Sequence, residues 1–414
     1  MYNTAVGSNA GIAVTTGVQN TIIGGLAGDA ITTANNNVAI GVGSAGATTT
    51  GSSNVAISVN ALGSNTTGST NVAIGQDTLF NNTTASNNTA VGHNAMVANT
   101  TGTRNVAVGA NSLDANTVGG KNVALGMDAL GTNVDGSRSV AIGDSALAAQ
   151  EPASAVDMYN VAVGHGAGAA ITTGIQNTAV GGLAFDAHTT GSENTALGYG
   201  SLSASTTASN NVAVGATALL TSTTGTSNVA VGRRALFSST TASNNTAIGN
   251  QALLSATTGG TNTAVGASSL DANTTGSANT SLGFGALSEN TTASNNTAVG
   301  YLSLLANTTG ATNTAVGANA LDANTTASNL VAVGNNALGK NTTGALNTAL
   351  GSSALAENTT GAENVAIGYL ALTNNTTGTH NVAVGSSDGS SGATLGTNST
   401  GSQNTALGMQ ALGS

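Results

Sequence analysis

The sequence predicts an all-β chain that folds as a repetitive parallel β-solenoid, or β-roll, of about 24 rungs with a 17-residue period. The string Asn-(Thr/Val)-Ala-(Val/Ile/Leu)-Gly returns every 17 residues, an aliphatic residue follows it at a fixed phase, and turn-forming residues separate the copies. We expect residues 1–414 to form a single continuous β-solenoid repeat array, with short inserts near 150–157 and 386–403.

The first five residues of each rung read as a strand. Counting the Asn as position 1, position 2 is Thr or Val, position 3 is Ala except at Ile22 and Ser281, and position 4 is Val, Ile or Leu. Positions 2 and 4 of a strand share one face and position 3 lies on the other, so both faces are apolar. Since one thin solenoid covers only one of them, we expect the Ala face to be buried against other subunits of a homo-oligomer.

The rest of the rung supplies a corner, a core residue and a turn. Gly at position 5 is missing only at Ser58, which predicts a positive φ or a close backbone approach. Position 9 is Leu in 17 rungs and is expected to be the second core residue. Positions 13–15 read Thr-Thr-Gly or Thr-Thr-Ala, which favours a strand followed by a turn.

Helix and disorder are the competing interpretations. No apolar set recurs at helical spacing, and Thr, Asn and Gly crowd every window, which excludes a helix. A disordered chain has no reason to hold an aliphatic residue at one phase through every repeat.

Composition excludes several classes of function. The net charge is −10 and only six residues are Lys or Arg, from which we expect no basic stripe, no nucleic-acid binding and no membrane insertion. There is no Cys, and aromatic residues make up 2% of the chain. A conventional enzyme core is therefore not expected, and the prediction is that the chain is not an enzyme.

Candidate residues for chemistry are few. The four histidines, His93, His165, His188 and His380, recur at no metal-ligand spacing and are expected to be solvated surface residues. Three aspartates at position 10 come directly after the position 9 Leu and are expected to line a solvated edge: Asp114, Asp271 and Asp322. We predict no catalytic residues, no cofactor-binding residues and no metal ligands, and hence no cofactor.

The two inserts are where a function specific to one rung would reside. Gln150 to Asp157 contains Glu151 and the only proline, and Ser386 to Gln403 is rich in Gly and Ser. Both are expected to be tolerated surface loops.

The strings NVAIG, NTAVG and NVAVG, followed by ALxxNTTGS-like segments, resemble the head repeats of trimeric autotransporter adhesins and, more closely, the 17-residue rungs of phage tail-fibre proteins. The resemblance covers nearly the whole chain. It implies a left-handed β-roll with three chains about a common axis, which is a homotrimer. The motif Met1-Tyr2-Asn3 recurs as Met158-Tyr159-Asn160, which fits either a piece of a longer fibre or a duplicated block.

These observations lead to three expected functions. The first is a structural fibre or adhesin segment, a phage tail-fibre shaft or a bacterial adhesin head, that forms an elongated rod for host or surface attachment. The second is a self-assembling extracellular filament subunit, and the third is an ice-binding solenoid that uses a Thr ladder. The expected partners are further copies of the chain, as a homotrimer or an end-to-end polymer, and a cell-surface glycan or receptor. The expected location is extracellular, on a virion tail fibre or a bacterial cell surface.

Overall fold

The computed structural model describes residues 2–388 and 392–413. All named elements in these residues are three-residue β-strands, and the chain divides into two compact units, Met1–Asn210 and Asn211–Ser414. The boundary follows Asn210, the last residue of a rung. The predicted all-β fold with one strand per rung is confirmed, and each unit is described by itself below.

The N-terminal unit holds the first twelve strands. They are β1 (Thr4–Val6), β2 (Thr21–Ile23), β3 (Val38–Ile40), β4 (Val55–Ile57), β5 (Val72–Ile74), β6 (Thr89–Val91), β7 (Val106–Val108), β8 (Val123–Leu125), β9 (Val140–Ile142), β10 (Val161–Val163), β11 (Thr178–Val180) and β12 (Thr195–Leu197).

The C-terminal unit holds the other twelve. They are β13 (Val212–Val214), β14 (Val229–Val231), β15 (Thr246–Ile248), β16 (Thr263–Val265), β17 (Thr280–Leu282), β18 (Thr297–Val299), β19 (Thr314–Val316), β20 (Val331–Val333), β21 (Thr348–Leu350), β22 (Val365–Ile367), β23 (Val382–Val384) and β24 (Thr405–Leu407).

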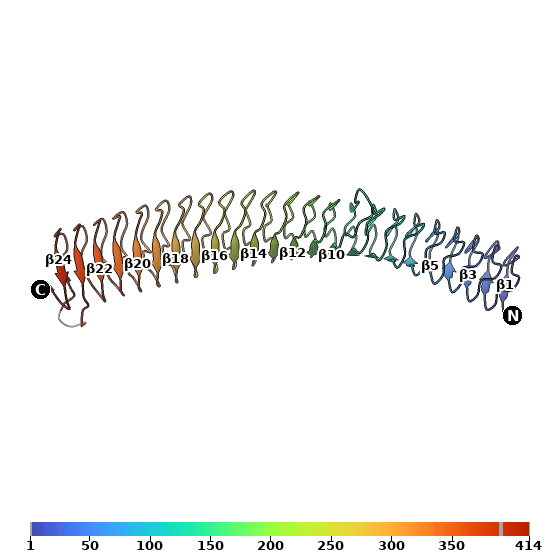
Figure 1. Cartoon of the computed structure of the whole chain (residues 1–414), viewed down its shortest axis with the longest axis horizontal. Helices are drawn as coiled ribbons and strands as arrows, with labels where there is room; N and C mark the ends of the chain where they lie inside the picture. The colour runs from blue at the N-terminus through green and yellow to red at the C-terminus, as the bar shows by residue number, and fades with distance from the viewer. Residues whose placement is uncertain (1, 389–391, 414) are drawn as a thin grey trace. The chain divides into compact units, whose positions relative to one another are not determined.

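Within each unit, every strand pairs in parallel with the strand of the next rung, and each residue faces the residue at its own position (Figure 1). In the pair β7 and β8, for example, Val106 lies opposite Val123 and Ala107 opposite Ala124. Strands of this kind are spaced by about 4.8 Å. The predicted parallel β-solenoid with a 17-residue period is thereby confirmed.

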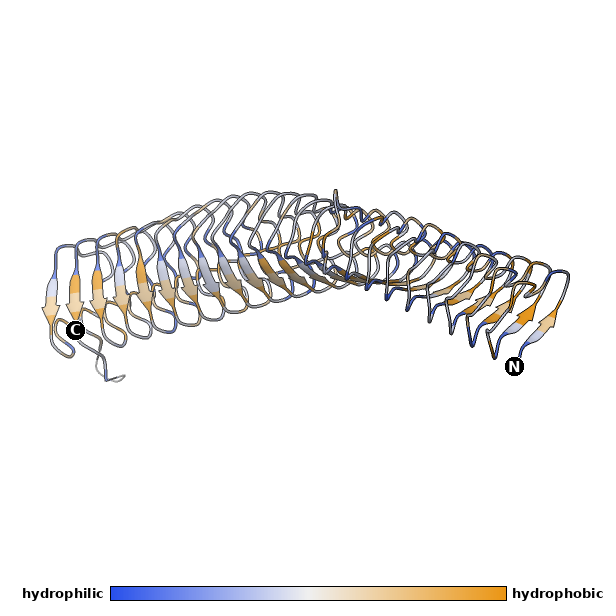
Figure 2. Cartoon of the chain, turned by 45° about the vertical axis from the view of Figure 1, so that its right-hand side comes forward, coloured by the Kyte–Doolittle hydropathy of each residue, from blue (hydrophilic) through white to orange (hydrophobic). Residues whose placement is uncertain are grey.

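The two strand faces are used in the opposite way to our expectation. After the first rung, where Ala5 is exposed, the Ala residues at position 3 are buried within a single chain, as Ala107 and Ala213 illustrate. The residues at positions 2 and 4 are half-buried or exposed. The prediction that the Ala face packs against other subunits is therefore wrong. A small side chain suits position 3 because the Leu at position 9 fills the interior of the rung; the larger Ile22 is buried where Gly11 and Gly28 replace that Leu. Figure 2 shows hydrophobic residues concentrated on the strands.

Leu at position 9 is the second core residue, as predicted: Leu113, Leu219 and Leu321 are all fully buried. Its backbone was not foreseen, because these residues have φ values of 51–54°. A bulky residue in the left-handed region is unusual and costs energy. Burial of the side chain offsets that cost in nearly every rung.

Gly at position 5 satisfies both parts of its prediction. Gly181 has a φ of +133°, and a Cβ added there would lie 2.6 Å from the carbonyl oxygen of Gly198 in the next rung. Ser58, the one exception to glycine, adopts a φ of 113°. The corner is thus set by a close approach between successive rungs.

Two columns of buried Asn side chains hold the turns together. At position 1, the backbone N–H of Asn88 donates to Asn71 Oδ1 (3.0 Å) and its Nδ2 donates to the carbonyl of Gly102 (2.8 Å). At position 12, Asn99 Nδ2 donates to Asn82 Oδ1 and to the same Gly102 carbonyl. These columns satisfy buried polar groups that would otherwise be costly.

The Thr-Thr segment lies in a bend and not in the predicted strand. The Thr at position 13 donates its hydroxyl hydrogen to the backbone of the next rung, as Thr66 Oγ1 does to the carbonyl of Thr83 (3.0 Å). The Thr at position 14, such as Thr67, is exposed.

Candidate functional site

The insert after β9 builds the most distinctive surface of the N-terminal unit. Gln150, expected in a surface loop, is instead buried and continues the position 12 column, since its Nε2 donates to Asn133 Oδ1 (2.9 Å). Glu151 Oε2 accepts a hydrogen bond from the backbone N–H of Val134 (2.7 Å). The chain then returns to the stack through Met158, whose side chain is fully buried and whose N–H donates to the carbonyl of Ser137 (2.9 Å).

The insert leaves an open cleft of about 570 Å³ lined by Ser137, Ala155, Val156 and Asp157. At its edge, Arg138 Nε forms an ion pair with Asp157 Oδ1 (2.9 Å), and the Arg138 guanidinium lies 5.5 Å from the centre of the Tyr159 ring. Tyr159 Oη donates to the other carboxylate oxygen of Asp157 (3.4 Å). One cation, one carboxylate and one aromatic ring therefore meet at this edge.

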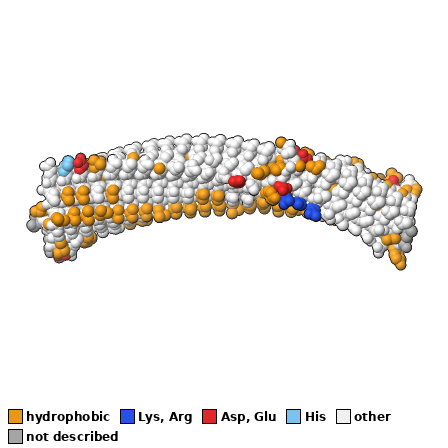
Figure 3. All heavy atoms as spheres, viewed as in Figure 1, with side chains coloured by type: hydrophobic (Ala, Val, Ile, Leu, Met, Phe, Trp, Pro, Cys, Tyr) orange, Lys and Arg blue, Asp and Glu red, His pale blue; other side chains and the backbone are white. Residues whose placement is uncertain are grey.

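Arg138 is the last member of a row of cations. Arg104, Lys121 and Arg138 occupy position 17 of three successive rungs, and all three are exposed. Their φ values are 61–62°, so the three backbones present their side chains in the same direction. We call these three residues the basic row. Figure 3 shows Lys and Arg side chains gathered side by side on the N-terminal unit.

The basic row corrects the expectation that six cations cannot form a stripe. Three of the six Lys and Arg residues stand in it. The signal was present in the sequence, because residues 104, 121 and 138 are spaced by the repeat period itself. The net charge of the whole chain, −10, hides this local column of cations.

A second candidate surface is the outer strand face, which we define as positions 2 and 4 of the strands. Leu197, Ile248 and Leu282 at position 4 are 44%, 40% and 46% exposed, respectively. In the C-terminal unit, Figure 3 shows a band of hydrophobic side chains running across successive strands. Contiguous exposed apolar surface of this kind is typical of interaction sites.

Exposed aromatic residues lie directly beside the outer strand face, at position 6. Tyr199, Phe284, Tyr301 and Tyr369 are each about half exposed or more. The Phe284 and Tyr301 rings, one rung apart, are stacked with centroids 5.8 Å apart. They extend the apolar surface beyond the strand.

The position 10 aspartates do not form the expected solvated edge, because Asp114, Asp271 and Asp322 are all only half-exposed. Burial raises the pKa of Asp114, with a further contribution from the nearby charge of Asp128, and burial likewise raises the pKa of Asp322. Asp271 Oδ1 accepts a hydrogen bond from Ser288 Oγ (2.6 Å).

One histidine departs from the prediction of solvated surface residues. His188 is fully buried at position 12, where it takes the place of an Asn. Its Nε2 lies 2.9 Å from the carbonyl oxygen of Gly191 and its Nδ1 lies 3.2 Å from Ser205 Oγ. Burial lowers the pKa of His188. The other three, His93, His165 and His380, are not buried.

The second insert was expected to be a surface loop over Ser386 to Gln403. Residues 389–391 of this prediction lie outside the described residues. From residue 392 the chain rejoins the rung, because Thr394 and Leu395 are buried and Leu372 N–H donates to the carbonyl of Thr394 (2.9 Å). The loop prediction is therefore wrong for this part of the insert.

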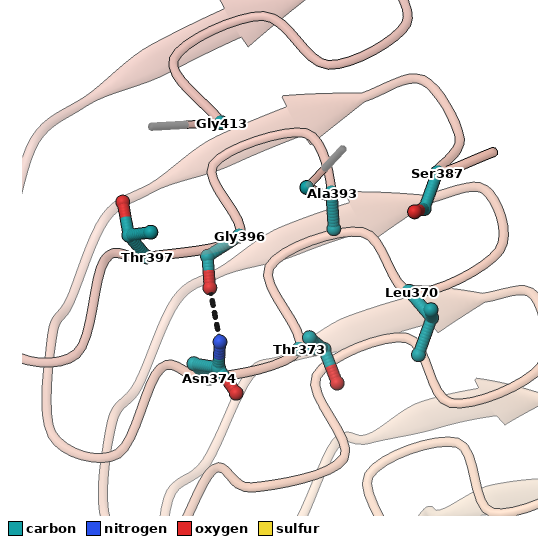
Figure 4. Close-up of a pocket in the computed structure, with 9 residues that line it drawn as sticks. Leu370, Thr373, Asn374, Ser387, Ala393, Gly396, Thr397 and Gly413 are labelled. Carbon is teal, nitrogen blue, oxygen red and sulfur yellow. Dashed lines mark hydrogen bonds between the residues drawn. The ribbon is translucent and has the colours of Figure 1, made fainter. Parts of the chain in front are cut away.

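A cleft of about 260 Å³ opens beside the second insert (Figure 4). Its wall carries small and polar groups, among them Thr373, Ala393 and Thr397, and Asn374 Nδ2 donates to the carbonyl of Gly396. Among the described residues that line it, none is an acid or a base.

Within the described residues, no three His, Asp or Glu side chains gather as a metal-binding group, and no helix is long and apolar enough to cross a membrane. No known protein-family model matches the chain, and no curated protein matches its sequence.

Proposed function

We propose that the chain is a structural segment of an extracellular attachment fibre, either a phage tail-fibre shaft or a bacterial adhesin head, and that copies of it associate through the outer strand face. The observation that carries this proposal is the repetition of one exposed apolar surface in rung after rung. An apolar face repeated in this way is suited to assembly with further copies.

The occupant of the outer strand face is a second copy of the same chain. Position 4 is Val, Ile or Leu in every rung, so two copies in register bring these aliphatic side chains against one another along each unit. At about 25 cal/mol per Å² of apolar area removed from water, small contributions from many rungs add to a stable interface. Three copies about one axis is the arrangement that the resemblance implies.

Replacing two outer-face residues by Glu tests this assembly. The variant Ile248→Glu/Leu282→Glu places charges at exposed positions of β15 and β17, where one chain tolerates them but an apolar interface does not. The matched control is Thr258→Glu/Thr292→Glu, which adds the same charges to the exposed position 14 of the same two rungs. Light scattering should show a lower mass for the first variant only. An unchanged mass for both would contradict the proposed interface.

The ice-binding alternative is weakened by the Thr geometry. The position 13 hydroxyls donate to the carbonyls of the next rung, for example Thr291 Oγ1 to Thr308 (3.2 Å). Position 14 presents exposed Thr side chains in rung after rung, whereas position 13 does so only at Thr15 and Thr206 among the described Thr residues. A single column is a narrow template for ordered water.

A further inference from the structure

The basic row is the least expected charged feature of this chain. Only six residues of 414 are Lys or Arg, and three of them stand at the same position of consecutive rungs. The column is otherwise filled by neutral residues and acids: Asn87 precedes the row, and Tyr159, Gln176 and Glu193 follow it. A solvated surface does not require cations to be grouped in this way.

The backbone fixes the row as a straight line. Lys121 N–H donates to the carbonyl of Thr103 (2.9 Å), and Arg138 N–H donates to the carbonyl of Gly120 (3.1 Å). The same bond in each rung keeps the Cα atoms one strand spacing apart, which is about 4.8 Å. The row is therefore a ladder of positive charge that runs parallel to the stacking direction.

Two of the three charges are not neutralised within the chain. Among the described residues, the ion pairs include neither Arg104 nor Lys121, whereas Arg138 is paired with Asp157. Three carboxylates lie in the rungs of the basic row, Asp114, Asp128 and Asp135, and none of the ion pairs of the described residues joins them to Arg104 or Lys121. Asp128 Oδ1 accepts a hydrogen bond from Asn111 Nδ2 (3.2 Å), and Asp135 Oδ1 accepts one from Thr117 Oγ1 (3.4 Å). The positive end of the row is thus at Arg104 and Lys121.

The surroundings of the row are rich in groups that bind sugars. Thr101, Thr103 and Ser137 place hydroxyl groups in the same rungs, and Tyr159, about half exposed, ends the row with an aromatic ring. Hydroxyls exchange hydrogen bonds with sugar hydroxyls, and an aromatic ring packs against the C–H face of a pyranose.

We propose that the basic row binds a linear acidic polysaccharide with one carboxylate on each sugar, lying parallel to the stack. Arg104 and Lys121, the two cations without an ion pair, lie one rung apart, which is about 4.8 Å, so carboxylates carried along an extended polymer chain meet both of them. The inference rests on the proposed attachment function for its biological meaning, because it names the class of surface to which the fibre attaches.

A nucleic acid fits this surface less well. Its affinity comes mainly from many phosphate contacts, and its density of negative charge is high. The row offers three cations on a chain with a net charge of −10, so a dense polyanion is repelled outside the row. A polysaccharide whose hydroxyls contribute to binding needs fewer charges.

The test measures binding of the full chain to polygalacturonate, which carries one carboxylate on each sugar. The same polymer with its carboxylates methyl-esterified is the matched ligand control, and duplex DNA is the competing polyanion. The variant Arg104→Asn/Lys121→Asn removes the two free cations, and Asn already stands at position 17 in Asn87 and Asn210. Arg233→Asn/Arg234→Asn removes the same charge from the C-terminal unit.

We expect the chain to bind polygalacturonate but not its ester, and Arg104→Asn/Lys121→Asn to weaken binding about tenfold, as the loss of two exposed charge contacts predicts. The Arg233→Asn/Arg234→Asn control should bind like the wild type. Any of four results would overturn the inference. The affinity for polygalacturonate could fall equally in both double variants, or the ester could bind as tightly as the acid. The chain could bind DNA more tightly than polygalacturonate, or it could fail to bind polygalacturonate. The mass of each sample is measured in parallel. If polygalacturonate does not bind but the chain has the mass of an oligomer, the binding site is contradicted and the proposed fibre is not. If polygalacturonate binds to a monomer, the proposed fibre is contradicted and the binding site is not.

Discussion

The corner glycine at position 5 allows a matched comparison of two adjacent residues. Gly181 has a φ of +133° and, as Ala, would place a Cβ 2.6 Å from the carbonyl oxygen of Gly198. Gly182 lies outside the positive φ range, and its added Cβ would meet only a Tyr199 ring carbon at 3.7 Å, an ordinary contact. The substitutions Gly181→Ala and Gly182→Ala therefore differ in backbone conformation and in the carbonyl contact alone.

The expected cost of Gly181→Ala has two parts. A rare backbone conformation costs about 1–3 kcal/mol. Moving the Gly198 carbonyl away weakens the bond from Gly198 N–H to the Val180 carbonyl (2.8 Å), which contributes about 0.5–1.5 kcal/mol. Ser58, which occupies the same corner at a φ of 113°, shows that the rung adjusts and does not collapse. We expect a total loss of about 1.5–4.5 kcal/mol.

Gly182→Ala should instead leave the unfolding free energy unchanged or raise it by about 0.4–1 kcal/mol, because Ala restricts the unfolded chain. Urea unfolding followed by circular dichroism gives both midpoints, and hydrogen exchange at the β11 and β12 amides shows whether the effect is local. Two variants that unfold at the same urea concentration would refute the close-approach explanation.

Two further predictions concern pH. Burial raises the pKa of Asp114 above the value of 3.8 for the free side chain, so the ionised carboxylate destabilises the folded state at pH 7. Asp114→Asn should therefore raise the unfolding free energy at pH 7, by less than about 1 kcal/mol because water screens a half-buried charge. The urea midpoints of the variant and of the wild type should converge as the pH falls below 3.8. Burial lowers the pKa of His188 below 6.5, so the stability of the wild type should fall as the pH drops through and below 6.5. His188→Asn, which restores the usual position 12 residue, should lose less stability over the same pH range. Melting temperatures that depend equally on pH in the two proteins would contradict this prediction.

The period, the strand, the corner glycine and the buried Leu were predictable because each depends on a residue type that recurs at one phase. The face that points inward was not. Both faces of Val-Ala-Val are apolar, and hydrophobicity alone favours burial of the larger side chains. Packing inside the rung decides the matter, since the Leu at position 9 fills the interior and leaves room for Ala107 and its equivalents, whereas Ile22 is buried at position 3 where Gly11 and Gly28 stand in place of that Leu.

The candidate site was less accessible to sequence reasoning. Lys121 and Leu113 both have left-handed backbone conformations, which are unusual for such side chains. Residue preferences therefore do not predict these conformations. His188 is buried because it stands in the position 12 column of buried Asn residues, where its Nε2 lies 2.9 Å from the Gly191 carbonyl oxygen. The hydrogen bonds that define this column cannot be read from the sequence. The basic row was predictable in principle, because its spacing is the repeat period.

The measurement that tests the account most directly is the mass of the purified chain in solution by light scattering, with negative-stain images of the same sample. We predict a discrete mass near three times the 39.2 kDa of one chain, with short particles of uniform length. Indefinite filaments would favour the polymer instead. A stable monomer at high concentration would contradict the central claim that copies of the chain cover the outer strand face.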